Sequence, residues 1–255
     1  MDTEARDKAL LNLLASLADN KYYLGRRYAE WCNGAPTLEA AVAAAAMAQD
    51  ELGHARAIYP LLRSFPGVDP TEVEPETRQH FWNVSFLDTA FTGWPDFVAA
   101  NFLLDTALTV LFEAARDSSF EPLRGRARKV LQEEHVHELH SEGWIRRLAK
   151  AGGTVPTTLG ESLKRMWAET LCWFGPPEDA GMKTLRDDDV LDALPEELRA
   201  RFLARIGPTL VQTGLHDALG LTRDGKHWVL MTPLPWSEWH ATTRRLAAER
   251  AGVWL

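Results

Sequence analysis

The chain has very little cysteine: only Cys32 and Cys172 occur in 255 residues. Neither belongs to a Cys-x-x-Cys pair, which argues against a disulfide framework and against a thiolate zinc site. The chain also lacks a basic surplus, because its formal net charge is −8 and its pI is about 5.5. Non-specific nucleic-acid binding needs a positively charged face, so we expect no nucleic-acid partner.

Long hydrophobic runs are missing as well. No stretch of about 18 apolar residues occurs, so we expect no membrane span. The first residues, MDTEARDKALLNLL, carry acidic side chains before the apolar positions, unlike a signal peptide. Together with the scarce cysteine, these features predict a cytoplasmic protein. No internal repeat and no low-complexity tract is evident either.

Helical periodicity dominates what the sequence does contain. Hydrophobic residues make up 45% of the chain, enough for a sizeable core, and we expect a single domain over residues 1–255. Apolar positions recur at helical spacing from residue 4 to about 32. A turn over 33–37 follows, and Thr37 is placed to cap a second helix that runs to about Arg63. These two helices predict a hairpin over residues 4–63.

A second hairpin is predicted over residues 95–150. Its first helix begins near Pro95 and ends at about Arg116, and its second begins near Pro122 and ends at about Lys150. Two long helical hairpins predict an all-α, four-helix bundle. We also predict shorter helices over 76–88, 157–174, 195–212 and 236–250. A polar loop is expected over 175–195 and a small β-hairpin within 220–235.

Two Glu-x-x-His motifs lie on the second arms of the two hairpins. They are Glu51–His54 and Glu134–His137. Residues three apart share a helix face, so each pair can hold one ion. One such motif arises often by chance, but two in matching places are specific. Carboxylate-bridged di-iron and di-manganese bundles use this pattern, with one more carboxylate from each first arm.

Hairpin geometry locates the residues that face these motifs from the first arms. Positions equidistant from the turn are roughly level, and reflecting Glu134 about Ser119 leads to Asp105. An acid in that apolar row is costly unless it is paired or bound to metal, so Asp105 is a candidate ligand. Reflecting Glu51 about the first turn leads to Lys21, which also faces the core and is not a carboxylate.

Two interpretations of this cluster remain open. In the first, Glu51, His54, Asp105, Glu134 and His137 bind metal, and Lys21 limits the site to one ion at most, iron or manganese. In the second, Lys21 pairs with the three carboxylates and no metal is bound, because buried charges must be balanced. His135 and His140 are expected on the surface. The run Arg124, Arg126, Arg128 and Lys129 is expected there too, although it could meet an acidic ligand such as a coenzyme A phosphate.

Several segments resemble the ferritin-like subunits of bacterial phenylacetyl-CoA epoxidase. The segment KYYLGRRYAEWCNGAPTLEAAVAAAAMAQDELGHA resembles the first hairpin of that family, with its Ala-Pro turn and Asp-Glu-x-x-His helix. FLLDTALTVLFEAARD and QEEHVHELHSEGW resemble the second hairpin, and LAAERAGVW resembles the end of the structural, C-type subunit. The resemblance implies a ferritin-like four-helix bundle with additional C-terminal helices.

The same resemblance implies a subunit of a multicomponent aromatic acyl-CoA oxygenase. In that family the A-type subunit is a di-iron oxygenase, and the C-type subunit is its partner with a degraded metal site. This chain keeps five of six ligand positions and has Lys21 at the sixth. The expected partners are a related ferritin-like subunit or a second copy, an acyl-CoA substrate, and an external reductase if the chain is catalytic. The alternatives are a stand-alone ferritin-like metal-dependent oxygenase or metal-binding protein, and a purely structural partner subunit.

Overall fold

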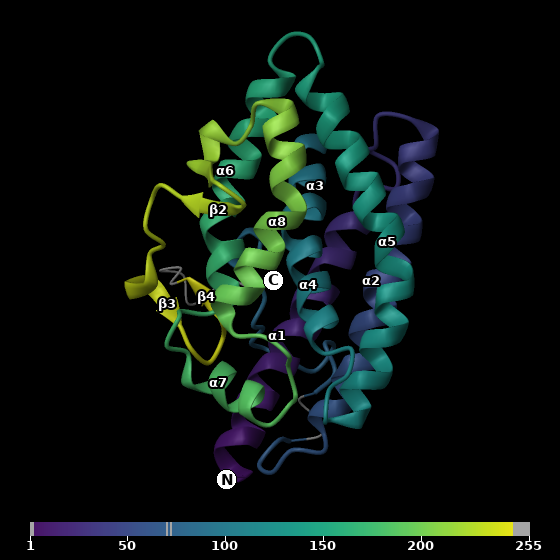
Figure 1. Cartoon of the computed structure of the whole chain (residues 1–255). Coiled ribbons are helices and arrows are strands. Elements are labelled where there is room, and N and C mark those ends of the chain that lie inside the picture. The colour runs from purple at the N-terminus through teal and green to yellow at the C-terminus, as the bar shows by residue number, and fades with distance from the viewer. Residues whose placement is uncertain (1–2, 70, 72, 247–255) are drawn as a thin grey trace.

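The structure of the chain is a computed structural model, and it describes residues 3–69, 71 and 73–246. Helices α1 (Thr3–Ala29) and α2 (Leu38–Leu62) form the first hairpin. The second hairpin consists of α3 (Trp94–Ala100), a π-helical segment (Asn101–Asp105) and α4 (Thr106–Ala114) as one arm and α5 (Glu121–Ala149) as the other. These bounds lie within a few residues of those predicted, and the four arms surround a common core (Figure 1).

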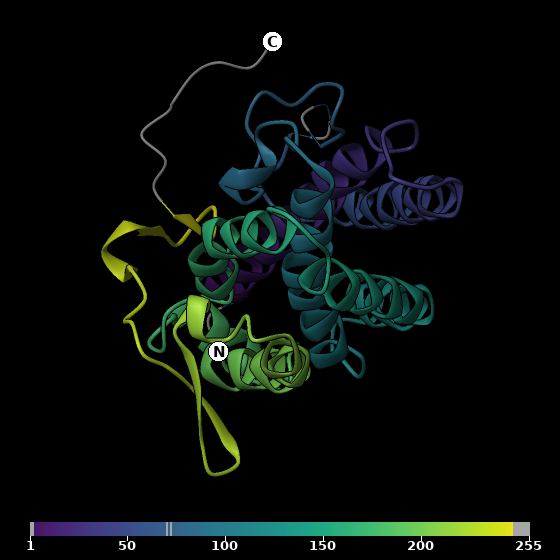
Figure 2. The same cartoon turned by 90° about the horizontal axis from the view of Figure 1, so that it is seen from above.

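The additional helices cover one side of this bundle. They are α6 (Val155–Trp173), α7 (Ala180–Asp187) and α8 (Pro195–Thr213). Strands β1 (Leu221–Asp224) and β2 (His227–Leu230) form the predicted hairpin, which projects from the bundle in Figure 2. Short strands β3 (Trp239–His240) and β4 (Arg245–Leu246) pair in antiparallel fashion. The fold is therefore all-α, with only small strand pairs.

Close helix packing in the first hairpin depends on small residues. Gly25 on α1 faces α2, where an added Cβ would lie 2.9 Å from Leu52 Cγ and 3.0 Å from Glu51 Cβ. Gly25 thus lets the α1 backbone approach α2 next to Glu51.

Thr37 caps α2 as expected, because its Oγ1 accepts a hydrogen bond from Ala40 N at 3.2 Å.

Two predicted helices are wrong. Residues 76–88 form turns with a single 3₁₀ turn at Ser85–Leu87, since side chains from other helices bind their main-chain N–H groups. Asp19 Oδ2 accepts from Trp82 N at 2.6 Å, and Glu169 Oε1 accepts from Ser85 N at 2.7 Å. Residues 236–246 form a 3₁₀ turn (Trp236–Glu238) and the strands β3 and β4 instead of a helix. The rest of that predicted helix, and all but Leu246 of the segment LAAERAGVW, lie outside the described residues.

The polar loop predicted over 175–195 contains α7, which was not foreseen. Asp179 caps this helix by accepting a hydrogen bond from Met182 N at 3.1 Å. Within the described residues, Trp94–Ala114 has the length and composition of a membrane-spanning helix, but 94% of its most apolar window is buried inside the protein. A core helix of a bundle passes the same test, so this segment gives only weak evidence for a membrane.

Candidate functional site

The centre of the bundle holds the six residues that the motifs and the hairpin geometry singled out. Lys21 comes from α1, Asp105 from the end of the π-helical segment, and the two Glu-x-x-His pairs from α2 and α5. Each of these residues is at most 3% exposed. The expected convergence is therefore present, and whether these residues bind metal stays a prediction.

Lys21 lies in the middle of the cluster. Its Nζ is 2.9 Å from Glu51 Oε1 and 2.7 Å from Asp105 Oδ1. The same atom is 2.6 Å from Glu134 Oε1. An ammonium group has three donors, and here each of them is directed to a different carboxylate. This is the geometry of the ion-pair interpretation.

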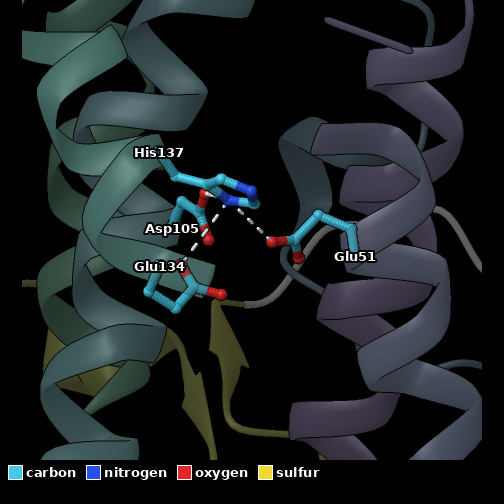
Figure 3. A group of neighbouring side chains, drawn as sticks. All are labelled: Glu51, Asp105, Glu134 and His137. Carbon is cyan, nitrogen blue, oxygen red and sulfur yellow. Dashed lines mark hydrogen bonds and ion pairs between the residues drawn. The ribbon is translucent and has the colours of Figure 1, made fainter. Parts of the chain in front are cut away.

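Four donors lie close enough together to share an ion. One ligand atom each from Glu51, Asp105, Glu134 and His137 lies within 4.8 Å of all the others, and Figure 3 shows them facing one another between α2 and α5. His54 stands at the edge of this group, with its Nδ1 3.3 Å from Glu134 Oε1. Buried glutamate, aspartate and histidine are ordinary ligands of iron and manganese, so this group could hold a metal.

Each motif histidine also contacts the acidic residue that directly precedes the other Glu-x-x-His motif. His137 Nε2 lies 3.3 Å from Asp50 Oδ2, and His54 Nε2 lies 2.6 Å from Glu133 Oε2. Asp50 and Glu133 are the residues directly before the two motif glutamates. The sequence reasoning did not assign them, although an acid before each Glu-x-x-His was the available signal. These contacts fix the orientation of both imidazole rings.

Further polar side chains complete the surroundings of Asp105 and Glu134. Asn101 Nδ2 donates to Asp105 Oδ2 at 3.1 Å, and Tyr28 Oη lies 3.4 Å from the same oxygen. Thr109 Oγ1 donates to Glu134 Oε2 at 3.0 Å. By contrast, Glu51 Oε2 is buried without a hydrogen-bond partner among the described residues. It is a free acceptor inside the cluster.

The electrostatics favour charged partners at the cluster centre. Burial opposes the charge of Lys21, but the carboxylates, with Asp105 foremost, outweigh it and raise its pKa well above the usual range. Burial would raise the pKa of Asp105, yet Lys21 and His137 hold it well below its usual value. Burial and the negative charge of Asp105 raise the pKa of Glu51 to about 7. Burial opposes protonation of His137, but hydrogen bonds to Asp105 and Glu51 raise its pKa to about 12.

These observations test how well a metal centre fits the residues present. A histidine ligand must give up its proton, and the hydrogen bonds of His137 to Asp105 and Glu51 raise its pKa against the effect of burial, which opposes binding of a metal there. The ammonium of Lys21 already binds one oxygen of every carboxylate in the cluster. A two-metal centre therefore does not fit this arrangement, and we derive no reaction step through one.

The space beside the cluster is narrow. The recess that reaches it, lined in part by Asn101, Thr106, Glu138 and Arg205, offers ≈ 0 Å³ to a water-sized sphere. Small-molecule sites usually measure several hundred Å³. This recess does not admit an aromatic acyl group in the described conformation.

Other candidates from the sequence have simpler roles. His135 is exposed, as predicted, but His140 is half-buried against Trp94, Phe97 and Trp144. Its Nδ1 lies 3.2 Å from Asn101 Oδ1. The basic run on α5 binds mostly main-chain carbonyl groups around the α4–α5 turn and near the end of α2, through Arg124, Arg126 and Arg128.

His140 should make the stability of the protein depend on pH. Burial, helped by the charge on His137, lowers its pKa to about 4, whereas an unfolded histidine has a pKa of about 6.5. The unfolded state therefore takes up the proton first, so this stabilisation is complete above pH 6.5 and is lost as pH falls towards 4. Between pH 6.5 and pH 4, the free energy of unfolding of wild type should fall by roughly 1–3 kcal/mol more than that of His140→Phe. This figure allows for partial screening of the charge by solvent. Denaturant unfolding at several pH values measures the difference, and His135→Phe, at an exposed position, should show no such trend.

The fold and the cluster together define a class: a ferritin-like helical protein with a buried site of the carboxylate and histidine type. The chain belongs to the phenylacetic acid catabolic protein family, which it matches over residues 1–249. It is also 25% identical over 192 residues to the C-type subunit of 1,2-phenylacetyl-CoA epoxidase from Escherichia coli (strain K12), an alignment covering 74% of this chain and 76% of that protein. The family expected from the hairpin motifs is thereby confirmed.

Proposed function

We propose that this chain is a cytoplasmic subunit of a multicomponent aromatic acyl-CoA oxygenase of the phenylacetate-degradation type. We propose further that it is the partner of a catalytic ferritin-like subunit, and that a network of ion pairs centred on Lys21 replaces the dinuclear metal centre. The family match over residues 1–249 and the similarity to a C-type epoxidase subunit support the first part. The whole chain, 1–255, would act as one domain.

The contact of Lys21 Nζ with all three carboxylates carries the second part. The distances of 2.9, 2.7 and 2.6 Å are those of charge-assisted hydrogen bonds, so one cation serves three buried acids. The narrow recess beside the cluster agrees with a role that needs no substrate there. Oxygenation would then take place on another chain, supplied with electrons by an external reductase.

A metal-binding role is the second candidate, because four donors lie within 4.8 Å of one another. Glu51, Asp105 and Glu134 bring three negative charges when ionised. Two divalent ions and a protonated Lys21 would leave a buried excess of two positive charges, which costs several kcal/mol or more. One divalent ion, iron or manganese, balances the three carboxylates together with Lys21. The cluster is thus expected to hold one metal at most.

Metal analysis of the purified protein tests this proposal. After anaerobic reconstitution with Fe²⁺, wild type should contain no more than one iron per chain, as measured by inductively coupled plasma mass spectrometry. Lys21→Glu supplies the missing carboxylate and should raise the content towards two. Lys129→Glu, an exposed change on α5, controls for non-specific binding and should leave the content unchanged. Two tightly bound irons per wild-type chain would overturn the proposed network.

A further inference from the structure

The recess beside the buried cluster ends at the surface where α8 lies against the bundle. Its inner end is formed by Asp105, Glu134 and His137, which are buried, and its outer end includes Glu138 and Arg205, which are half-buried. Helix α8 packs against both α4 and α5, and Figure 1 shows it beside α4. A residue from outside the four-helix bundle therefore stands where this recess meets the solvent.

That residue, Arg205, joins two helices of the bundle across the mouth of the recess. Its Nη2 donates to Glu113 Oε1 on α4 at 2.7 Å, and its Nε lies 3.4 Å from Glu138 Oε1 on α5. The three side chains are 26%, 32% and 29% exposed, so both ion pairs stand at the border between protein and water. With both contacts made, the recess has no room for a water-sized sphere.

The edge of α8 that faces α5 is held by polar contacts. Arg146 on α5 donates from Nη2 to Thr209 Oγ1 at 3.0 Å and from Nε to Gln212 Oε1 at 2.9 Å. Elsewhere on α8 the packing is apolar, as where the ring of Phe202 contacts that of Phe174. The apolar face anchors the helix, whereas partly exposed ion pairs are weak. The side chain of Arg205 can therefore swing into solvent while α8 stays in place.

The charges at the mouth decide which solutes can enter. Glu113 and Glu138 by themselves would draw cations towards the recess, and the carboxylates of Asp105 and Glu134 lie at its inner end. The guanidinium of Arg205 lies between the two outer acids and places a positive charge on the path. This charge repels a cation and does not repel a neutral or anionic solute of the same size.

We infer that Arg205 is a gate at the mouth of this recess, closed by its contacts with Glu113 and Glu138, and that its charge keeps small cations, divalent metal ions among them, away from the buried carboxylates. Lys21 opposes a cation inside the cluster, and Arg205 opposes it at the entrance. The inference concerns access to the cluster, so it does not depend on the assignment of the chain as an oxygenase subunit.

Labelling of a thiol placed in the recess tests the gate. Thr106 lines the recess and is 5% exposed, so Thr106→Cys is made in the full chain together with Cys32→Ser. Three alkyl methanethiosulfonates of similar size are used, bearing an aminoethyl (cationic), an ethyl (neutral) or a sulfonatoethyl (anionic) group. Each transfers its thioalkyl group to an accessible thiolate, forming a mixed disulfide and releasing methanesulfinate. Peptide mass spectrometry gives the rate at position 106 and at Cys172, which is fully buried and reports global unfolding.

Arg205→Met removes the charge and both ion pairs but keeps a long side chain. It should speed labelling at position 106 by the cationic reagent roughly 10-fold or more, with a smaller gain for the neutral reagent and the smallest for the anionic one. Arg205→Lys keeps the charge and should retain most of the discrimination against the cationic reagent. Arg201→Met is the matched control, because Arg201 is also on α8, is 41% exposed and pairs with Asp192, and it should leave all three rates unchanged.

Three results would overturn the gate. Labelling at position 106 that never outpaces labelling of Cys172 would show that the recess does not open in the folded protein. Equal acceleration of all three reagents by Arg205→Met would show that charge does not control entry. Equal effects of Arg201→Met and Arg205→Met would show that position 205 has no special role. Thermal melts confirm that each variant is folded, and the subunit assignment stands in all three cases because it rests on the family match.

Discussion

Replacing Lys21 by methionine is expected to lower the free energy of unfolding by about 3–5 kcal/mol, because the change removes the ammonium group that lies within 3 Å of all three buried carboxylates of the cluster. Methionine fills a similar volume, so the loss reports charge and not a cavity. Glu51, Asp105 and Glu134 are at most 2% exposed and cannot recover this energy from water. Urea unfolding of the metal-free variant measures the effect.

A divalent cation should rescue the same variant. With Lys21 gone, Mn²⁺ or Fe²⁺ can neutralise the carboxylates, and the midpoint of thermal unfolding should rise by several degrees with metal. Wild type should respond much less, since Lys21 already provides the counter-charge. Lys129→Met is the control for loss of a lysine from the exposed side of α5. If Lys21→Met unfolds like Lys129→Met without metal, Lys21 does not balance the charge of the buried carboxylates as proposed.

Replacing Arg78 by methionine should have the second large effect. Arg78 Nη2 donates to Asp19 Oδ2 at 2.8 Å, and Asp19 is fully buried on α1. Asp19 also accepts hydrogen bonds from Tyr59 Oη at 2.9 Å and from Trp82 N at 2.6 Å. Removing one partner of a buried ion pair leaves an uncompensated charge, so we expect a loss of about 3–5 kcal/mol in the free energy of unfolding.

Two further variants show that the loss comes from the unpaired charge. The double variant Asp19→Asn with Arg78→Met should recover part of the stability, because the buried group is then neutral. Arg63→Met breaks a pair with Glu74 in the same loop region, but both side chains are well exposed, and it should cost less than about 1 kcal/mol. Equal losses for Arg63→Met and Arg78→Met in chemical denaturation would show that the burial of Asp19 is not the cause.

The long helices could be predicted because their information is local. Apolar residues at helical spacing, the Thr37 cap and Pro122 near the start of α5 each act within a few residues of where they stand. Reflection about the second turn located Asp105, since helices rise by about 1.5 Å per residue on both arms. The π-helical segment at 101–105 does not move Asp105 away from the height of the second motif, because Asp105 Oδ2 lies 3.0 Å from His137 Nδ1.

The failures lie where side chains from distant helices bind the main chain. Residues 76–88 have helical spacing, but Asp19, Asn20 and Glu169 bind the N–H groups of Trp82, Val84 and Ser85, which then cannot form a helix. The segment 236–246 is held in another way. Arg244 has a φ of 56° and donates from its buried guanidinium to Trp173 O and Phe174 O at the end of α6. The partners in such contacts are far apart in the sequence, so no local pattern reports them.

By itself the sequence determined the all-α class, the two hairpins and the six side chains that meet at the centre of the bundle, because helix formation and helix faces depend on neighbours within one or two turns. It left open whether Lys21 pairs with the acids or stands beside a metal. Only the tertiary structure decided that the three donors of Lys21 point to Glu51, Asp105 and Glu134, since the reach of one ammonium depends on how four helices pack. The pairing of Asp50 with His137 and of Glu133 with His54 arose in the same way, from the separation of α2 and α5.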